Sequence, residues 1–301
     1  MQVEPYTTMQ PPAAIPRFVL VTGSSTGIGK ACALHLAKNG FSVIAGVRKL
    51  DDAKQLELIA GPNVQGIQLD IADSDSIAAA SARIAQTTGE SGLAGIVNNA
   101  GIGVHGPVEF LSRDDWRRQF EVNVFGHADV TRALLPLLRK HVLARGAGSA
   151  RIIFIGSIAG RISMPIMAPY CASKHAIASI ASSLRMELRN QGIHVCLIEP
   201  GAIQSEIWRK GDEYGTAIPP DAPAREHYGK QIDAILRVSR ESAATAIPAE
   251  VVARLVQHCM TSSNPPRRRT VGRDAMFGAI FRRILPEKWF DRFVTSAMKI
   301  G

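Results

Sequence analysis

The sequence predicts an α/β protein built on a single doubly wound parallel sheet of about seven strands, with helices on both faces. Three observations lead to this prediction. Short apolar runs, typical of buried strands, alternate with amphipathic helical patterns between residues 17 and 272. A glycine-rich turn joins the first strand to the first helix. Polar or glycine-containing stretches follow several strands, at the sheet edge where open α/β folds bind ligands.

Composition favours one cytoplasmic globular protein. The 301 residues are 46% hydrophobic, enough for one large domain or two small ones. No run approaches the roughly 20 apolar residues of a membrane span, and the proline-rich residues 1–16 do not resemble a secretory signal. We expect these residues to form a flexible arm. The cysteines lack C-x-x-C spacing, which favours buried, reduced thiols and no metal site. They are Cys32, Cys171, Cys196 and Cys259.

The formal net charge of +9 is concentrated near the carboxyl terminus, where residues 254–301 hold ten Lys or Arg against three acids. Because the excess is local and no aromatic platform accompanies Arg267–Arg269, we expect no nucleic-acid partner. Residues 273–301 form a basic amphipathic tail. It could contact an anionic membrane peripherally, cover the substrate cleft or be a solvated helix. We favour the two structural interpretations over the membrane.

The first strand, residues 17–21, runs directly into Thr22–Gly29, and a helical pattern follows as far as Asn39-Gly40. The glycines have the spacing G-x-x-x-G-x-G. They let the backbone approach a pyrophosphate, whose charge the helix N-terminus attracts. Strand, glycine-rich turn and helix in this order are typical of a dinucleotide-binding, Rossmann-type domain.

The second strand, residues 41–47, ends at Arg48-Lys49, where this fold often carries an acid for the ribose 2′-hydroxyl. A cation there can pair with a 2′-phosphate, so the sequence favours NADP(H), with NAD(H) as the alternative. A solvated basic loop is the other interpretation of Arg48. A helix is expected over 51–60.

Polar residues end the next two strands, which we expect at 64–69 and 93–97, with a helix over 73–88 between them. Asp70 follows the first of these strands, and Asn98-Asn99-Ala100-Gly101 follows the second. A long helical pattern then covers 114–145. Asn123 falls on its apolar stripe, so it is either a packed polar residue satisfied by backbone or part of the site.

The fifth strand, Ile152–Ile155, leads to Ser157, and a helix from Pro169 to about Asn190 carries Tyr170 and Lys174. Four residues apart, Tyr170 and Lys174 lie on one helix face. The ammonium is expected to lower the pKa of the phenol, which would let Tyr170 exchange a proton near neutral pH. Taken alone, the pair marks an amphipathic helix start more often than a catalytic site.

The sixth strand, 193–198, ends before Pro200-Gly201. Residues 202–246 look irregular except for a helix near 228–238, and such an insertion often covers a ligand as a lid. A helix over 251–260, a last strand at 268–271 and a terminal helical region complete the chain. We therefore expect one catalytic domain over 17–272.

Together these motifs resemble the classical short-chain dehydrogenase/reductase family across residues 17–272, in the family's order and spacing. The resemblance implies that Tyr170 donates the proton in carbonyl reduction and that Lys174 binds the nicotinamide ribose. Ser157 would hold the substrate oxygen, and Asn123 would anchor a water. The implied cofactor contacts are Gly23, Ser25, Gly27, Ile28, Gly29, Arg48, Asp70, Asn98, Ala100, Gly101, Tyr170, Lys174, Pro200, Gly201, Ile203 and Ser205.

Two positions depart from the family's pattern. Ser205 stands where members carry Thr, and it keeps the hydroxyl. Thr26 stands where many NADP-dependent members carry a basic residue, which weakens the case for NADP(H).

Within the family, the stretches around Arg48, Tyr170 and Pro200 look like the 17β-hydroxysteroid and retinol dehydrogenase branch. The expected function is hydride transfer between NADP(H) and a lipophilic alcohol or ketone of steroid, retinoid or long-chain type. The alternatives are an NAD-dependent alcohol dehydrogenase of the family and a non-catalytic dinucleotide-binding regulatory protein. Family members often form dimers or tetramers, for which the leucines Leu134, Leu138, Leu184 and Leu188 offer a face. Apolar pocket walls are expected from Ile162, Met164, Ile166, Met167, Ile203, Ile207 and Trp208.

Overall fold

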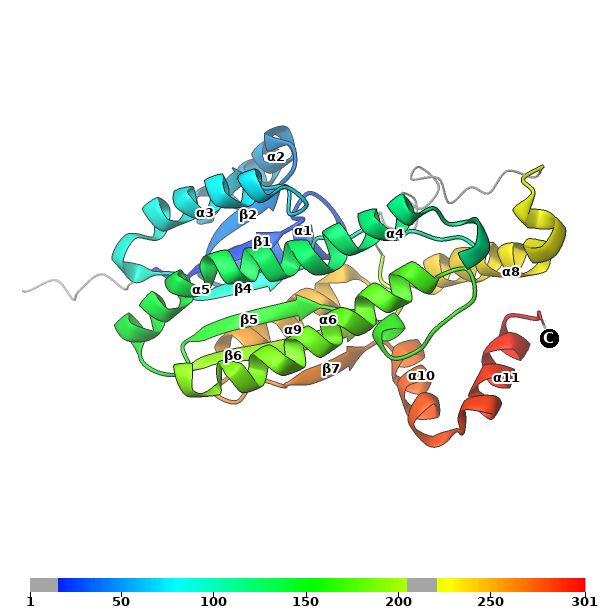
Figure 1. Ribbon diagram of the computed structural model, residues 1–301. Coiled ribbons are helices and arrows are strands. Elements are labelled where there is room, and N and C mark those ends of the chain that lie inside the picture. The colour runs from blue at the N-terminus through cyan, green and yellow to red at the C-terminus, as the bar shows by residue number, and fades with distance from the viewer. Residues whose placement is uncertain (1–15, 205–220, 301) are drawn as a thin grey trace, which may run out of the picture.

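Seven parallel strands form one sheet in the order β3-β2-β1-β4-β5-β6-β7, as predicted (Figure 1). The computed structural model describes residues 16–204 and 221–300. Every adjacent pair is parallel, and β1 lies between β2 and β4, where the direction of winding reverses. The strands are β1 Phe18–Thr22, β2 Ser42–Val47, β3 Val64–Gln68, β4 Gly95–Asn98, β5 Ala150–Ile155, β6 Ile193–Pro200 and β7 Arg268–Val271.

Helices cover both faces of the sheet because alternate strand residues point to opposite sides. Val19 and Val21 of β1 pack with α1 and α9, whereas Leu20 between them packs with α3, α5 and α6. The helices are α1 Gly27–Lys38, α2 Leu50–Ala60, α3 Ser74–Thr88, α4 Arg113–Phe120, α5 Gly126–Arg145, α6 Ala168–Glu187, α8 Ala224–Thr245, α9 Ala249–Thr261, α10 Arg273–Ile284 and α11 Glu287–Ala297.

The long helix expected over 114–145 is interrupted by a π-helical turn, Glu121–Phe125, between α4 and α5. Such turns widen the helix by one residue and often occur at functional sites. Here the turn contains Asn123, whose buried amide bonds the backbone of Ile102. The sequence pattern missed the interruption because the apolar stripe continues through it.

The region 202–246, expected to be largely irregular, contains the 22-residue helix α8. Its buried positions, Ala224, Ile232 and Ala234, are few, so the apolar stripe is too narrow to stand out among charged residues. Residues 205–220, which include Ser205, Ile207 and Trp208, lie outside the described part of the chain. A lid role for this region stays a prediction.

The predicted dimer face is wrong in one respect. Leu134 and Leu138 of α5 and Leu188 after α6 are buried in the core against the sheet. They therefore cannot present an apolar stripe to a second subunit. Residues outside this buried stripe, such as the exposed Met186 of α6, form the outer surface of the two helices.

Candidate active site

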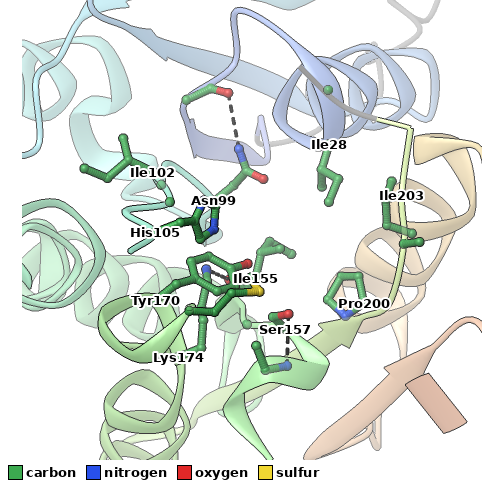
Figure 2. Close-up of a pocket in the computed structure, with 18 of the residues that line it drawn as sticks. Ile28, Asn99, Ile102, His105, Ile155, Ser157, Tyr170, Lys174, Pro200 and Ile203 are labelled. Atoms are coloured by element: carbon green, nitrogen blue, oxygen red, sulfur yellow. Dashed lines mark hydrogen bonds between the residues drawn. The ribbon is translucent and has the colours of Figure 1, made fainter. Parts of the chain in front are cut away.

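A cavity of about 500 Å³ opens at the carboxyl ends of the strands, at the edge that the sequence predicted (Figure 2). Its walls come from the turn after β1, the loop after β4, the segment after β5 and helices α6 and α8. The structure brings most of the predicted site residues into this lining. They are Gly23, Ser25, Gly27, Ile28, Arg48, Asp70, Ala100, Gly101, Ser157, Tyr170, Lys174, Pro200, Gly201 and Ile203.

Glycines shape the turn between β1 and α1. Gly23 and Gly27 have φ angles of +64° and +55°, which side chains rarely allow, and a Cβ on Gly23 would lie 2.8 Å from Ala100 Cα. Gly29 lies behind the cavity, where a Cβ would overlap the Gly23 carbonyl oxygen. The close packing aims the N-terminus of α1 at the cavity, and no acidic residue in its first turn opposes an anion.

Asn99 stabilises this turn, although the family resemblance implied that Asn98 contacts the cofactor. The Asn99 Nδ2 donates to the carbonyl oxygens of Thr22 and Gly23 at 2.9 and 3.2 Å. Asn98 instead points to the opposite face of the sheet, where its Nδ2 donates to Thr131 Oγ1 at 2.9 Å. It does not line the cavity. Strand alternation could have distinguished the two, since Val97 and Asn99 share one side of the sheet and Ile96 and Asn98 the other.

Tyr170 and Lys174 lie one turn apart on α6 and both line the cavity. The Lys174 Nζ is 5.7 Å from the centre of the Tyr170 ring and donates to the Ile155 carbonyl oxygen at 3.1 Å. Ser157 follows β5, so its hydroxyl meets the Tyr170 phenol in a hydrogen bond. The three groups converge on one point of the cavity wall (Figure 2).

Burial dominates the electrostatics of this pair. It raises the pKa of Tyr170 to about 12, and the hydrogen bond from Ser157 offsets only part of that increase. Burial also lowers the pKa of Lys174 to about 8. The expectation that the ammonium lowers the pKa of Tyr170 is therefore wrong for the protein without ligand, because burial removes hydration from both charged forms. Tyr170 lines the cavity and packs against Met167 and Cys171, so its side chain is half-buried.

Asn123 supports the site from behind without lining the cavity. Its Oδ1 accepts from Ile102 N and its Nδ2 donates to Ile102 O, both at 2.9 Å. The same Nδ2 donates to Ser173 Oγ at 3.2 Å, and Ser173 Oγ donates to the Tyr170 carbonyl oxygen at 2.7 Å. Asn123 thus joins the loop after β4 to the first turn of α6.

Gln119, which no sequence motif indicated, belongs to the same network. Its Oε1 accepts from Val104 N at 2.6 Å, and its Nε2 donates to Ile102 O at 3.0 Å. It is fully buried. Its position could have indicated it, because Gln119 lies four residues before Asn123 on the same apolar stripe. A second polar side chain on that stripe also needs hydrogen-bond partners.

An apolar part of the cavity wall surrounds Tyr170. The expected Ile162, Met164, Ile166 and Met167 line it, and α8 adds Ile232, Ile235 and Leu236. These α8 residues lie within the helix that was expected near 228–238, but the sequence did not show which face of that helix meets the cavity. His105, also in this wall, lies beside Tyr170.

Comparison with known proteins agrees with this geometry. The family model for short chain dehydrogenases matches residues 17–214. This chain belongs to the short-chain dehydrogenase/reductase family. A relative from Ornithobacterium rhinotracheale, named NADPH-dependent 3-dehydrocapnine reductase, is 33% identical over 285 residues, covering 94% of this chain and 98% of its own.

Two further matches place this short-chain dehydrogenase within the family. Retinol dehydrogenase 5 from Mus musculus is 33% identical over 288 residues, covering 92% of this chain and 87% of its own. A solved short-chain dehydrogenase from Streptomyces avermitilis superposes with a TM-score of 0.75 at 25% identity, covering 96% and 98% of the two chains. Relatives named retinol and 17-beta-hydroxysteroid dehydrogenase assign it to the branch that the sequence indicated.

This short-chain dehydrogenase is an oxidoreductase, and its cavity fits a nicotinamide dinucleotide. Gly23 and Gly29 let the turn pack closely against Ala100 and against itself, so the N-terminus of α1 can receive a pyrophosphate. Arg48 and Asp70 line the end of the cavity beside this cradle, and Tyr170 and Lys174 line the other end. The residues present can thus hold a dinucleotide along the sheet edge.

Proposed function

We propose that this short-chain dehydrogenase transfers a hydride between NADP(H) and a lipophilic alcohol or ketone of steroid, retinoid or long-chain type. The observation that carries the proposal is one cavity that a glycine cradle and Tyr170 both line, with apolar side chains around Tyr170. Apolar walls bind apolar substrates through the area that they remove from water. The names of the Ornithobacterium rhinotracheale and Mus musculus relatives are consistent with such substrates.

Tyr170, Ser157 and Lys174 have different roles in the proposed proton transfer. A bound reduced nicotinamide supplies the hydride that reaches the carbonyl carbon. The Tyr170 hydroxyl donates the proton that the carbonyl oxygen then takes up, and in alcohol oxidation the phenolate accepts it. Ser157 holds the same oxygen through its hydroxyl. The ammonium of Lys174 favours the phenolate left behind, at a site where low hydration strengthens the interaction between charges.

A Tyr170→Phe variant tests this assignment. It removes the proton donor and leaves the ring and the glycine cradle in place, so we expect turnover to fall by at least about a hundredfold with NADPH affinity unchanged. Fluorescence titration of NADPH alongside a ketone-reduction assay separates the two effects. Unchanged turnover would rule out Tyr170 as the acid. Cofactor binding without turnover in the wild type would favour a regulatory dinucleotide-binding protein.

The preference for NADP(H) over NAD(H) rests on Arg48, which lines the adenosine end of the cavity. A guanidinium there can pair with a 2′-phosphate that NAD(H) lacks. Titration with NADPH and NADH should give at least tenfold tighter binding of NADPH, about 1.4 kcal/mol, and Arg48→Ala should abolish the difference. Equal affinities in the wild type would instead favour the NAD-dependent alternative.

We also propose that the enzyme forms a homodimer or tetramer through the outer faces of α5 and α6. Met186 of α6 is exposed there, while the buried leucines of both helices face the sheet. Light scattering after gel filtration should give a multiple of the 32.4 kDa chain mass. Met186→Glu should shift that mass toward the monomer, whereas a monomeric wild type would end the proposal.

The hairpin of α10 and α11 supports peripheral contact with an anionic membrane surface. Large apolar side chains are exposed on both helices, among them Ile284 at 69%, Trp289 at 59% and Phe277 at 52%. Residues 273–300 carry six basic and three acidic side chains. Their net positive charge is attracted to an anionic lipid surface and repels a second copy of the same hairpin. Gly278 of α10 packs against Ile158 and Ile162 of the cavity wall, so the hairpin adjoins the substrate site. In the described part of the chain, no helix is long and apolar enough to cross a bilayer.

Vesicle flotation tests this contact. The wild type should float with phosphatidylcholine vesicles that contain phosphatidylserine, and less with phosphatidylcholine alone. The double variant Trp289→Glu/Phe293→Glu should lose flotation. Leu58→Glu, at a leucine 86% exposed on α2, is the matched control and should keep it. A wild type that stays with the soluble fraction, or a double variant that changes only the oligomeric mass, would contradict the membrane assignment.

A further inference from the structure

His105 is a polar residue of the cavity lining beside Tyr170. It comes from the loop after β4 and lines the cavity together with Ile102, Met164 and Met167. Its ring centre is 6.2 Å from that of Tyr170, at an interplanar angle of 59°. Figure 2 shows it next to the Tyr170 ring.

The imidazole has no hydrogen-bond partner among the described residues, in contrast to the buried amides nearby. Gln119 and Asn123 are both satisfied by backbone groups of the same loop. Gly103 has no side chain, and this gives the imidazole room beside Tyr170. A Cβ at Gly103 would lie 3.0 Å from His105 Cε1 and 3.8 Å from Tyr170 Cδ2. A polar group held in an apolar wall without a partner is free to bond a ligand.

The chemistry of the ring restricts that ligand. Burial lowers the pKa of His105 to about 4, so the ring is neutral at physiological pH and presents one N–H donor and one bare nitrogen acceptor. The charged side chains among the described lining residues are Arg48, Asp70, Lys174 and Asp274, and none belongs to the apolar wall. The position therefore suits a neutral group that can both donate and accept, rather than a carboxylate or sulfonate.

We propose that His105 determines substrate specificity by hydrogen-bonding a hydroxyl or amino substituent close to the reacting carbon. The substrate would then be a long apolar molecule with two neighbouring polar groups: the carbonyl or alcohol bound by Tyr170 and Ser157, and a second group bound by His105. Because the His105 and Tyr170 ring centres are 6.2 Å apart, the proposal puts the second group on a carbon near the reacting one. This inference rests on the proposed oxidoreductase function and narrows its substrate class.

Matched substrates and variants test the proposal. The probes are 2-dodecanone and 1-hydroxy-2-dodecanone with NADPH. We expect the wild type to show at least about tenfold higher kcat/KM for the hydroxyketone, because a ketone without the hydroxyl leaves the imidazole unpaired. His105→Leu should lose this preference while retaining activity on 2-dodecanone. His105→Gln, which keeps a donor and an acceptor, should retain part of the preference.

Two outcomes would overturn the specificity role. One is a wild type without preference, and the other is a His105→Leu variant in which activity on both ketones falls by the same factor. Calorimetric binding of 1,2-dodecanediol and 2-dodecanol to the protein with NADP⁺ present separates this role from the proposed function. If turnover is absent, the proposed function fails, and a diol preference that His105→Leu removes still supports the role of His105. Equal binding of the two alcohols by the wild type refutes it.

Discussion

The carboxylate of Glu199 accepts a hydrogen bond from Arg161 Nε at 2.7 Å, at the end of β6. The same carboxylate accepts a second hydrogen bond from Arg268 Nε of β7 at 2.8 Å. Arg161 directly follows the short helical turn Ile158–Gly160 next to Ser157, and Pro200 of the cavity wall follows Glu199. One buried anion therefore fixes the segment after β5 against the last two strands.

Replacing Glu199 with Gln should destabilise the fold. The Glu199 side chain is only 1% exposed, whereas its two arginine partners are about one third exposed. The variant leaves two guanidinium groups without an anion, but solvent screens them partly, so we expect a loss of about 2 kcal/mol in unfolding free energy. Urea denaturation measures it. Lys140→Ala breaks a solvent-exposed pair with Glu90 and should cost under about 1 kcal/mol. Equal costs for the two variants would contradict a structural role for Glu199.

Asn99 and Asn98 should differ in their effect on cofactor binding. Asn99→Ala removes the amide that holds the carbonyls of Thr22 and Gly23, so NADPH affinity should fall about tenfold as the turn relaxes. Asn98→Ala breaks the bond to Thr131 on the opposite face and should lower thermal stability with little change in affinity. Fluorescence titration and thermal unfolding distinguish the two. The reverse pattern would restore Asn98 as the cofactor contact.

A methyl group at Gly29 should abolish cofactor binding. A Cβ there would overlap the carbonyl oxygen of Gly23, so Gly29→Ala must push α1 away from the turn. Gly229 on α8 has no atom within 4 Å of such a Cβ. Gly229→Ala should therefore stabilise the helix by about 0.5 to 1 kcal/mol and leave binding unchanged. NADPH titration and urea denaturation of both variants check this contrast, which would fail if Gly29→Ala bound cofactor normally.

Lys174 should make the unfolding free energy depend on pH. Its pKa is about 8 in the folded protein, whereas an unfolded chain leaves the lysine at its ordinary pKa of 10.5. Between these values the unfolded state binds more protons, so the contribution of Lys174 to unfolding free energy rises with pH, by at most about 1.4 kcal/mol per unit. The destabilisation caused by burying the charged ammonium is therefore full below pH 8 and absent above about pH 10.5.

The measurement compares the wild type with Lys174→Met, a variant without the charge. The stability advantage of the methionine variant should shrink as pH rises from 8 to 10.5, in denaturation of the cofactor-free protein. Tyr170, whose pKa is raised to about 12, titrates in both proteins and cancels in the difference. A difference that does not vary with pH would show that burial does not shift the pKa of Lys174.

Local sequence determined much of this protein. The strands were predicted to within two residues at nearly every boundary because buried parallel strands are short apolar runs between breakers. Tyr170 and Lys174 could be paired from their spacing, since four residues on a helix return to the same face. The glycine turn was recognisable because only glycine tolerates the backbone angles and close approaches at Gly23 and Gly29.

Tertiary structure decided what depends on contacts between distant segments. Whether Asn98 or Asn99 faces the cavity follows from which side of β4 each one occupies. Enclosure by several elements, rather than the neighbouring Lys174, sets the pKa of Tyr170. His105 acquires its place beside the phenol only when the loop after β4 packs over α6. Desolvation and side-chain orientation are properties of the assembled fold, so spacing along the chain determines the candidate residues but not their environment.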